Sequence, residues 1–216
     1  MKFKATSNKL PLPYISYSQW WLFKRDPEEY FQQYYIARVD EQTDPMLLGK
    51  IFQEAWCDPE GYDYAKELWD AGFTPDKARI MKTALDHPYL IKAEEMKETE
   101  KEIKATPRKK RAKELGLTYT IMGVLDGWDG RVIENKFGAP WSQQRADEAE
   151  QATWYALLTY IEEGTIPEII LQSINSRHGI PSCFRTKRNK NDLKQMVEEI
   201  NNMVKLLRAG DFTQRA

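Results

Sequence analysis

Two carboxylates and a lysine near the middle of the chain have the types and spacing that metal-assisted chemistry needs. Asp126, Glu134 and Lys136 lie in the segment GVLDGWDGRVIENK. Glu134 and Lys136 are two residues apart, so on a strand both side chains project from one face, while Asp126 ends the preceding strand across a turn. Mg²⁺ prefers carboxylate oxygens, and a lysine beside it can orient or deprotonate the attacking water and offset phosphate charge. The pattern therefore indicates metal-assisted hydrolysis of phosphodiesters.

The connection between these two strands decides whether the two carboxylates can meet. A two-residue turn at Asp129 and Gly130 would pair Asp126 with Ile133, and Glu134 would then face the other side of the sheet. We therefore predict an odd-length connection or a bulge, with the glycine in the left-handed conformation. Placement of Asp126 and Glu134 on opposite faces would exclude the site.

Helical and strand periodicities divide the chain into two regions. We expect helices over 18–38 with a break at Pro27, 46–56, 62–71, 75–97 with an interruption at Pro88, 142–163 and 191–207, and strands over 100–105, 117–125, 131–137, 166–175 and 181–186. Ser16, followed by Gln19, matches the capping box that begins a helix. The order predicts one α/β domain over 1–216, with a mainly helical lobe at 1–97. Residues 98–216 would form a central mixed β-sheet flanked by helices, with the catalytic hairpin and the C-terminal helix.

Composition and charge exclude several classes of protein. The chain has 216 residues, 41% of them hydrophobic and 30% charged, with a net charge of -1, so it is an ordinary globular protein that does not hold nucleic acid through bulk positive charge. Cys57 and Cys183 are too few for a four-cysteine zinc or iron–sulfur site. No apolar run is long enough to span a membrane, and the polar N-terminus lacks a signal-peptide pattern. We therefore expect a cytoplasmic protein without a membrane partner.

The Asp-x7-Glu-x-Lys spacing between two strands resembles the core motif of the PD-(D/E)XK nuclease superfamily. Three further segments resemble motifs of its RecB-like branch and follow in the right order. They are the N-terminal helix segment Ile15–Ser18 with Phe23–Pro27, the Gly-x-x-x-His motif at Gly49–Ala55, and the Gln-x-x-x-Tyr motif at Gln151–Tyr155. Together these motifs span about residues 15 to 160. The resemblance implies a restriction-endonuclease-like core and a metal-dependent nuclease.

The resemblance also implies a role for each site residue. The metal ligands for Mg²⁺ or Mn²⁺ would be Asp126, Glu134, the main-chain carbonyl of Asn135, and Gln53. The catalytic side chains would be Asp126, Glu134, Lys136, Gln151 and Tyr155, with Lys136 positioning the water. Gln151 and Tyr155 are one helical turn apart and hence lie on one helix face. Glu100 or Glu102, on the first strand of the core, would have a minor role behind the ligands.

Two positions depart from the family pattern. Gln53 stands where the family often has a metal-binding histidine. An amide oxygen can bind a hard cation but lacks the affinity of imidazole for softer ions. We therefore expect a weaker first metal site with less preference for Mn²⁺, or participation of Glu54. Asp26 stands where the iron–sulfur members carry a cysteine, so no cluster is expected.

Contacts with DNA are expected from two basic segments and from the N-terminal motif. The proposed contacts are Ser16, Ser18, Arg108, Lys109, Lys110, Arg111, Lys187 and Arg188. Because lysine and arginine contacts release counterions from DNA, affinity should fall steeply with salt. The aromatic cluster Trp20, Trp21, Tyr30, Tyr34 and Tyr35 is expected in the core, although one of its rings could stack on a base.

The sequence thus favours a metal-dependent deoxyribonuclease, and analogy with the RecB-like branch favours an exonuclease acting on DNA ends in recombination or DNA processing. A small nuclease of this kind suits a phage or mobile-element system, with a recombination or single-strand-binding protein as partner. Two alternatives stay open. One is a nucleic-acid-binding module with degraded catalysis, because the histidine is missing at Gln53. The other is a restriction-type endonuclease, which should have a sequence-reading element and act as a dimer.

Overall fold

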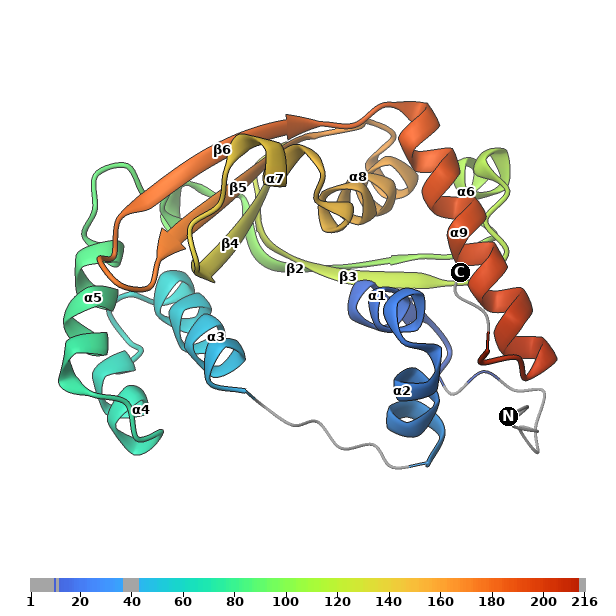
Figure 1. The fold of residues 1–216 in the computed structure, drawn as a ribbon. Coiled ribbons are helices and arrows are strands. Elements are labelled where there is room, and N and C mark those ends of the chain that lie inside the picture. Colours follow the sequence, from blue (N-terminus) through green and yellow to red (C-terminus); the bar gives the residue numbers. More distant parts are fainter. Residues whose placement is uncertain (1–9, 11, 37–42, 214–216) are drawn as a thin grey trace.

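A six-stranded mixed sheet forms the centre of the protein (Figure 1). The computed structural model describes residues 10, 12–36 and 43–213. The strands are β1 (Ile15–Ser16), β2 (Glu98–Ala105), β3 (Ile121–Trp128), β4 (Val132–Gly138), β5 (Glu168–Asn175) and β6 (Pro181–Lys187). Their order is β1-β3-β4-β5-β6, and β2 also pairs with β3. The predicted α/β class with a mixed sheet flanked by helices is confirmed.

One edge of β3 is shared by two strands. β1 pairs in parallel with Ile121 and Met122, and β4 pairs antiparallel with Gly127 and Trp128. In the part of the chain that the structure describes, no strand pairs with residues 123–126 on this edge. β3 and β4 therefore diverge beyond Gly127. We refer to this divergence as the fork, and Asp126 is the first β3 residue inside it.

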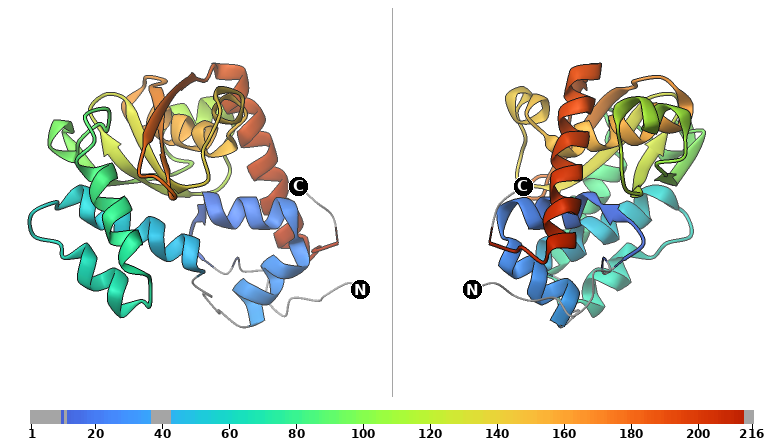
Figure 2. Two further views of the ribbon diagram at one scale, coloured as in Figure 1. Left: turned by 60° about the vertical axis from the view of Figure 1, so that its left-hand side comes forward. Right: turned by 90° about the vertical axis from the view of Figure 1, so that its right-hand side faces the viewer.

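The helices form two groups at opposite ends of the sheet. They are α1 (Tyr17–Arg25), α2 (Pro27–Phe31), the π-helix η1 (Gln32–Ile36), α3 (Asp44–Cys57), α4 (Tyr64–Asp70), α5 (Pro75–Leu85), the 3-10 helix η2 (Ala93–Glu95), α6 (Lys110–Leu115), α7 (Gln143–Asp147), α8 (Glu150–Glu163) and α9 (Lys190–Ala209). Figures 1 and 2 show α3–α5 at one end, and α1, α2 and α9 at the other. Each group has its own hydrophobic core, one around Trp20 and Trp154 and the other around Phe52 and Met81. Among the described helices, none has both the length and the apolar character needed to cross a bilayer.

The first two helices are set by local sequence. Ser16 and Gln19 form the predicted capping box, in which the Ser16 main-chain N–H donates to Gln19 Oε1 at 2.9 Å. Pro27 ends the helix as predicted, and the Asp26 side chain caps α2 by accepting from the main-chain N–H of Glu29 at 2.9 Å. The predicted helix over 18–38 is thus broken into α1, α2 and η1, and its last two residues lie outside the described residues.

Other predicted elements differ from the structure in their limits. The helix predicted over 142–163 is two helices, α7 and α8, and the helix predicted over 75–97 ends at Leu85. A short helix, α6, lies in the basic segment that contains Arg108–Arg111, where no helix was predicted. β1 has two residues and is too short for a recognisable alternation. These differences concern the limits of helices and strands and the connections between them, and the order of the long elements is as predicted.

The crossover from β4 through α8 to β5 makes β4 an inner strand. β4 and β5 pair in parallel along their length, with Glu134 opposite Leu171 and Lys136 opposite Ser173. Parallel neighbours need such a helical crossover, and α8 consequently packs close to the residues that the β4 strand presents. This arrangement buries Glu134, whose exposed fraction is 3%.

Candidate active site

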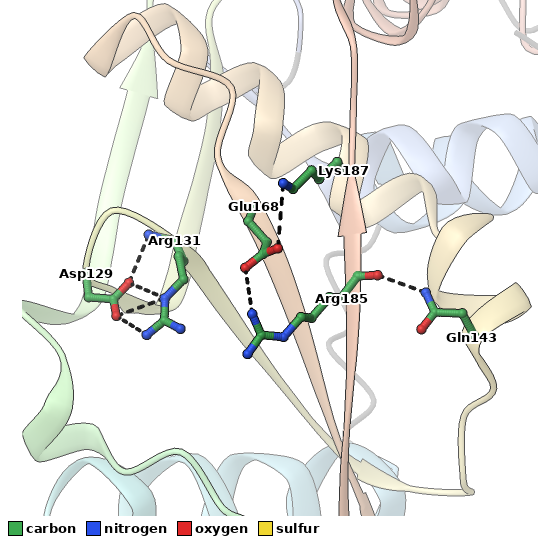
Figure 3. A network of polar contacts seen from close by, with 6 residues as sticks. All are labelled: Asp129, Arg131, Gln143, Glu168, Arg185 and Lys187. Atoms are coloured by element: carbon green, nitrogen blue, oxygen red, sulfur yellow. Dashed lines mark hydrogen bonds and ion pairs between the residues drawn. The ribbon is translucent and has the colours of Figure 1, made fainter.

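The turn between β3 and β4 has the predicted irregularity. Gly127 pairs with Ile133 and Trp128 with Val132, so the connection is Asp129–Arg131 and not a two-residue turn. Gly130 has φ +103°, a left-handed conformation that glycine adopts without strain. The Asp129 carboxylate accepts from the main-chain N–H of Arg131 at 2.9 Å and pairs with its guanidinium (Figure 3). Continued by one position, this register would bring Asp126 opposite Glu134, and both residues line one cavity.

Asp126 sits inside the fork and bonds to the backbone of the other strand. The main-chain N–H of Asn135 donates to Asp126 Oδ2 at 2.7 Å, where a regular ladder would have a carbonyl. Burial raises the pKa of Asp126 well above its usual value, and the negative charge of Glu134 raises it further. The hydrogen bond from Asn135 and the ammonium of Lys136 act in the opposite direction. A nearby cation would therefore stabilise the ionised carboxylate.

Glu134 has one satisfied and one unsatisfied carboxylate oxygen. Its Oε1 accepts from Lys136 Nζ and from Gln151 Nε2, the latter at 2.8 Å. Its Oε2 is buried and makes no hydrogen bond. A buried acceptor without a partner is unfavourable by about 1–3 kcal/mol. The unpaired oxygen is the feature of this site that most directly suits a bound cation.

The N-terminal half of α8 brings Gln151 and Tyr155 next to the residues of β4. Gln151 Oε1 accepts from Lys136 Nζ at 2.8 Å, and Gln151 Nε2 also donates to the Tyr155 hydroxyl at 2.8 Å. Burial raises the pKa of Tyr155 well above its usual value, and the charge of Glu134 adds to this, so the hydroxyl stays neutral. A Cβ at Gly123 would lie 2.7 Å from Leu158 Cδ1. The glycine thus allows α8 to lie close to β3.

Gln53 reaches the site from α3, through Asn135. Gln53 Oε1 accepts from Asn135 Nδ2 at 3.0 Å, and Asn135 Oδ1 accepts from Gln172 Nε2 at 2.8 Å. The two amides fix the Asn135 side chain on the α3 side of β4. Gln53 lines the same cavity as Asp126, whereas Glu54 is not among the residues that line it. Of the two proposed replacements for histidine, the geometry therefore favours Gln53.

One cavity of about 750 Å³ joins these residues. Of the predicted site residues it is lined by Gln53, Asp126, Glu134, Asn135, Lys136 and Gln151. It is also lined by Tyr17, Trp21, Trp141 and Arg145, which the sequence did not assign to the site. Tyr17 falls in the N-terminal motif and Trp21 in the aromatic cluster, so the sequence did single out the segments that contain them. No pattern in the sequence distinguished Trp141 or Arg145.

The face of β3 that points into the hydrophobic core changes at Asp126. Ile121 and Leu125 before it, and Trp128 after it, belong to one hydrophobic core, although strict alternation would put Trp128 on the opposite face. On the neighbouring strand Glu100 comes level with Asp126, and its φ of +50° makes it the one non-glycine residue with positive φ among those described. The charge of Glu100 also contributes to the raised pKa of Asp126. Both strands are therefore distorted at the level of the site.

The donor set fits a hard divalent cation. In residues 12–36 and 43–213 no group of three or more His, Cys, Asp and Glu side chains is arranged for metal binding. Asp126 and Glu134 are nevertheless paired, and Mg²⁺ typically uses one or two carboxylates together with water and phosphate. The unpaired Glu134 Oε2 and the raised pKa of Asp126 are both relieved by a positive charge between them. The residues present thus suit Mg²⁺ better than an ion that needs several side-chain ligands.

Several predicted DNA contacts are already used within the protein. Lys109 pairs with Glu162, and Arg111 donates to the carbonyl of Glu162 at 3.1 Å, near the C-terminal end of α8. At 1.5 Å per residue, this end is about 16 Å along the helix from Gln151. Arg111 therefore anchors α8 and lies away from the cavity. The exposed neighbours Arg108 and Lys110 stay predictions for DNA contact.

Arg188 is also engaged within the protein. Its guanidinium donates to the Thr153 hydroxyl at 2.8 Å and to the Ala149 carbonyl at 3.0 Å, so it fastens the joint between α7 and α8 to the end of β6. Lys187 is exposed but stands opposite Glu168, at 3.9 Å from Nζ to Oε1 (Figure 3). Arg188 therefore has a structural role, and Lys187 remains a weak candidate for DNA contact.

The two serines of the N-terminal motif lie beside the cavity lining and not in it. Ser16 caps α1, and its Oγ is 3.0 Å from the exposed Ser18 Oγ. Between them, Tyr17 does line the cavity, together with Trp21 one turn further along. The N-terminal motif thus contributes aromatic rings to the site, and contact of either serine with DNA stays a prediction.

Comparisons with known proteins bear on the fold. No protein-family model and no curated protein matches the chain. The crystal structure of a "putative exonuclease" from Eubacterium rectale superposes with a TM-score of 0.65, over 95% of this chain and 85% of that chain, at 14% sequence identity. The protein therefore shares the fold of one described as an exonuclease, at an identity that carries the fold alone.

Proposed function

We propose that the protein is a metal-dependent nuclease that hydrolyses phosphodiester bonds of DNA. Asp126 and Glu134, with the main-chain carbonyl of Asn135, would bind Mg²⁺ or Mn²⁺, and Gln53 would add an amide oxygen. The buried and unpaired Oε2 of Glu134, next to Asp126 and Lys136, is the observation that carries the proposal. The match of these residues to the PD-(D/E)XK pattern supports it.

When bound, the metal supplies a lowered pKa for a coordinated water and neutralises charge on the phosphate. The side chains around it have separable roles. Lys136 Nζ has three donors and gives two of them to Glu134 and Gln151. The remaining donor can hold the attacking water or a phosphate oxygen. Gln151 fixes the ammonium and the Glu134 carboxylate together, and the neutral Tyr155 hydroxyl fixes Gln151.

Action on DNA ends, as an exonuclease in recombination or DNA processing, is the finer proposal. It is supported by the shared fold with a protein described as an exonuclease and by the resemblance to the RecB-like branch. A recombination or single-strand-binding protein would be its partner, in a bacterial cytoplasm if a phage encodes the protein. A restriction-type endonuclease and a binding module without catalysis are the alternatives. An endonuclease would also cut closed circles, whereas a binding module would cut neither circular nor linear DNA.

The test is a nuclease assay on linear and covalently closed circular duplex DNA, each with Mg²⁺, with Mn²⁺ and with EDTA. The wild type is compared with Glu134→Gln, Lys136→Met and the control Glu163→Gln, which makes the same carboxylate-to-amide change at an exposed position at the far end of α8. We expect degradation of linear DNA only, in the presence of metal only. Both site variants should lose at least about 100-fold in rate, and Glu163→Gln should not.

Cutting of closed circles would move the assignment to an endonuclease. Equal activity of wild type and Glu134→Gln would refute the site. Retardation of DNA by all variants without cutting under any condition would identify a binding module whose catalysis is lost.

A further inference from the structure

Two tryptophans from distant parts of the chain line the candidate active-site cavity. Trp21 lies on α1, and Trp141 lies in the segment between β4 and α7. A guanidinium covers one face of each ring, with Arg25 at 4.3 Å from the Trp21 ring centre and Arg145 at 4.3 Å from that of Trp141. Each of these rings thus pairs with an arginine, and Arg145 itself also lines the cavity. We refer to the two ring–arginine pairs as the tryptophan pairs.

The exposure of Trp21 sets it apart from its neighbour. Trp20 and Trp154 are fully buried and pack on each other at 6.0 Å between ring centres, whereas the adjacent Trp21 is 39% exposed. Trp21 is less exposed than Trp69 on α4, but unlike Trp69 it lines the cavity that holds the carboxylates. Its exposed ring can therefore receive a flat ligand that enters this cavity.

The charges of the cavity do not favour a ligand bound by phosphate contacts alone. Four carboxylates line it, from Asp126, Glu134, Glu148 and Glu150, against the cations of Lys136 and Arg145. Electrostatic attraction of a phosphate backbone depends on many basic contacts, which this lining lacks. Stacking of bases on aromatic rings supplies affinity that does not depend on net charge.

The size of the cavity also limits the ligand. A volume of about 750 Å³ lies in the range of sites that enclose one small molecule. Such a site can admit a nucleotide or two of an unpaired strand. In a duplex the base faces are occupied by neighbouring bases, and extruding one requires a few kcal/mol. The rings can therefore reach bases far more easily in single-stranded DNA.

We propose that Trp21 and Trp141 stack on bases of single-stranded DNA and guide an unpaired strand to Asp126 and Glu134. This inference rests on the proposed function, because both use the same cavity. The guanidinium groups of Arg25 and Arg145, each over one face of its ring, would keep the rings oriented. The preferred substrate of the nuclease is then a single-stranded end or overhang.

The test measures binding by fluorescence anisotropy in EDTA, so that the DNA stays intact. The probes are a labelled oligothymidylate, a blunt duplex of the same length, and an abasic strand that keeps the phosphates but lacks the bases. Trp21→Ala and Trp141→Ala are compared with the wild type. Trp69→Ala is the matched control, because Trp69 is a more exposed tryptophan on α4 and lies outside the cavity lining.

We expect the oligothymidylate to bind at least about tenfold more tightly than the duplex or the abasic strand. Trp21→Ala and Trp141→Ala should each weaken oligothymidylate binding by about 5- to 150-fold and should not affect the abasic strand. Trp69→Ala should leave all affinities unchanged. Trp21→Phe and Trp141→Phe keep a ring and should restore most of the affinity. Their recovery separates stacking from a general loss of folding.

Equal binding of the abasic strand and the oligothymidylate by the wild type would overturn the inference, and this comparison needs no variant. An equal effect of Trp69→Ala would overturn it as well. The proposed function fails in a different way, namely when linear DNA is not cut with metal or when Glu134→Gln is as active as the wild type. Tryptophan-dependent binding without cutting would keep the stacking inference and refute the nuclease.

Discussion

Glu134→Gln should make the metal-free protein more stable while it abolishes the proposed activity. The wild-type carboxylate keeps Oε2 buried without a hydrogen bond, which is unfavourable by about 1–3 kcal/mol. An amide at this position removes the buried charge next to Asp126, and its NH2 group, in the place of Oε2, is expected to donate to the Asp126 carboxylate. The variant also loses the ion pair with Lys136, whose side chain is 26% exposed and retains Gln151 as acceptor, so this loss is worth about 0–1 kcal/mol. The two ranges leave a net stabilisation of about 0–3 kcal/mol, centred on about 1–2 kcal/mol.

For a chain of this length the net change corresponds to a rise in Tm of about 2–8 °C in EDTA. Differential scanning calorimetry and urea unfolding measure it, and Glu163→Gln is the control for the exchange of a carboxylate by an amide. Mg²⁺ should distinguish the two proteins. At a hundredfold excess over its Kd it should stabilise the wild type by about 2.7 kcal/mol, and it should have little effect on Glu134→Gln.

The pH dependence provides an independent check on the same pair. Because the pKa of Asp126 is raised in the folded protein, the native state holds a proton that the unfolded state releases above about pH 3.9. The contribution of Asp126 to the stability of the metal-free wild type should therefore be fully present below that pH and should be lost as the pH rises toward the folded pKa. This loss of stability with rising pH should be shallower in Glu134→Gln, because the variant lacks the negative charge of Glu134 that helps to raise the pKa of Asp126. A variant less stable than the wild type in EDTA, or equally stabilised by Mg²⁺, would refute the reasoning.

Three further predictions concern the framework of the site. Gly179→Ala should destabilise the protein by about 3 kcal/mol or more, because the new Cβ would lie 2.4 Å from a backbone oxygen. Gly72→Ala is the control: its φ is also positive but its surroundings are open, so it should cost about 1–2 kcal/mol. Equal losses of stability in urea unfolding would contradict this explanation. Asp129→Asn should lower stability at pH 7 by about 0.5–1 kcal/mol. The ion pair with Arg131 lowers the pKa of Asp129, so the difference in stability between wild type and variant should vanish as the pH falls below about 4 through the folded pKa. A stability difference that persists at low pH would count against the ion pair. Arg188→Ala should lower the free energy of unfolding in urea by about 2–3 kcal/mol, because it leaves carbonyl and hydroxyl partners unpaired. Arg188→Lys should recover less than half of this loss. A loss under about 0.5 kcal/mol for Arg188→Ala would exclude the structural role.

The parts of the site that could be predicted are those governed by local periodicity. The two-residue spacing of Glu134 and Lys136 and the one-turn spacing of Gln151 and Tyr155 place side chains on a common face, and the structure brings the two pairs together. The requirement for an odd-length connection followed from the period of a strand, and the connection Asp129–Arg131 meets it.

The parts that could not be predicted depend on contacts between distant segments. The change of the inward face of β3 at Asp126 violates the alternation on which strand predictions rest, and the positive φ of Glu100 has no counterpart in its residue type. Arg111 and Arg188 looked like surface cations, because nothing in the sequence shows that helix-end carbonyls lie within their reach. Trp141 joins the cavity only through the fold.

The fork between β3 and β4 also gives the protein a built-in spectroscopic probe. The amide proton of Asn135 is held by the carboxylate of Asp126 and not by a strand carbonyl. Its chemical shift and its rate of exchange with deuterium therefore depend on the charge of that carboxylate. One backbone resonance can thus report protonation of Asp126, arrival of a cation and entry of a nucleotide, without any label attached to the cavity.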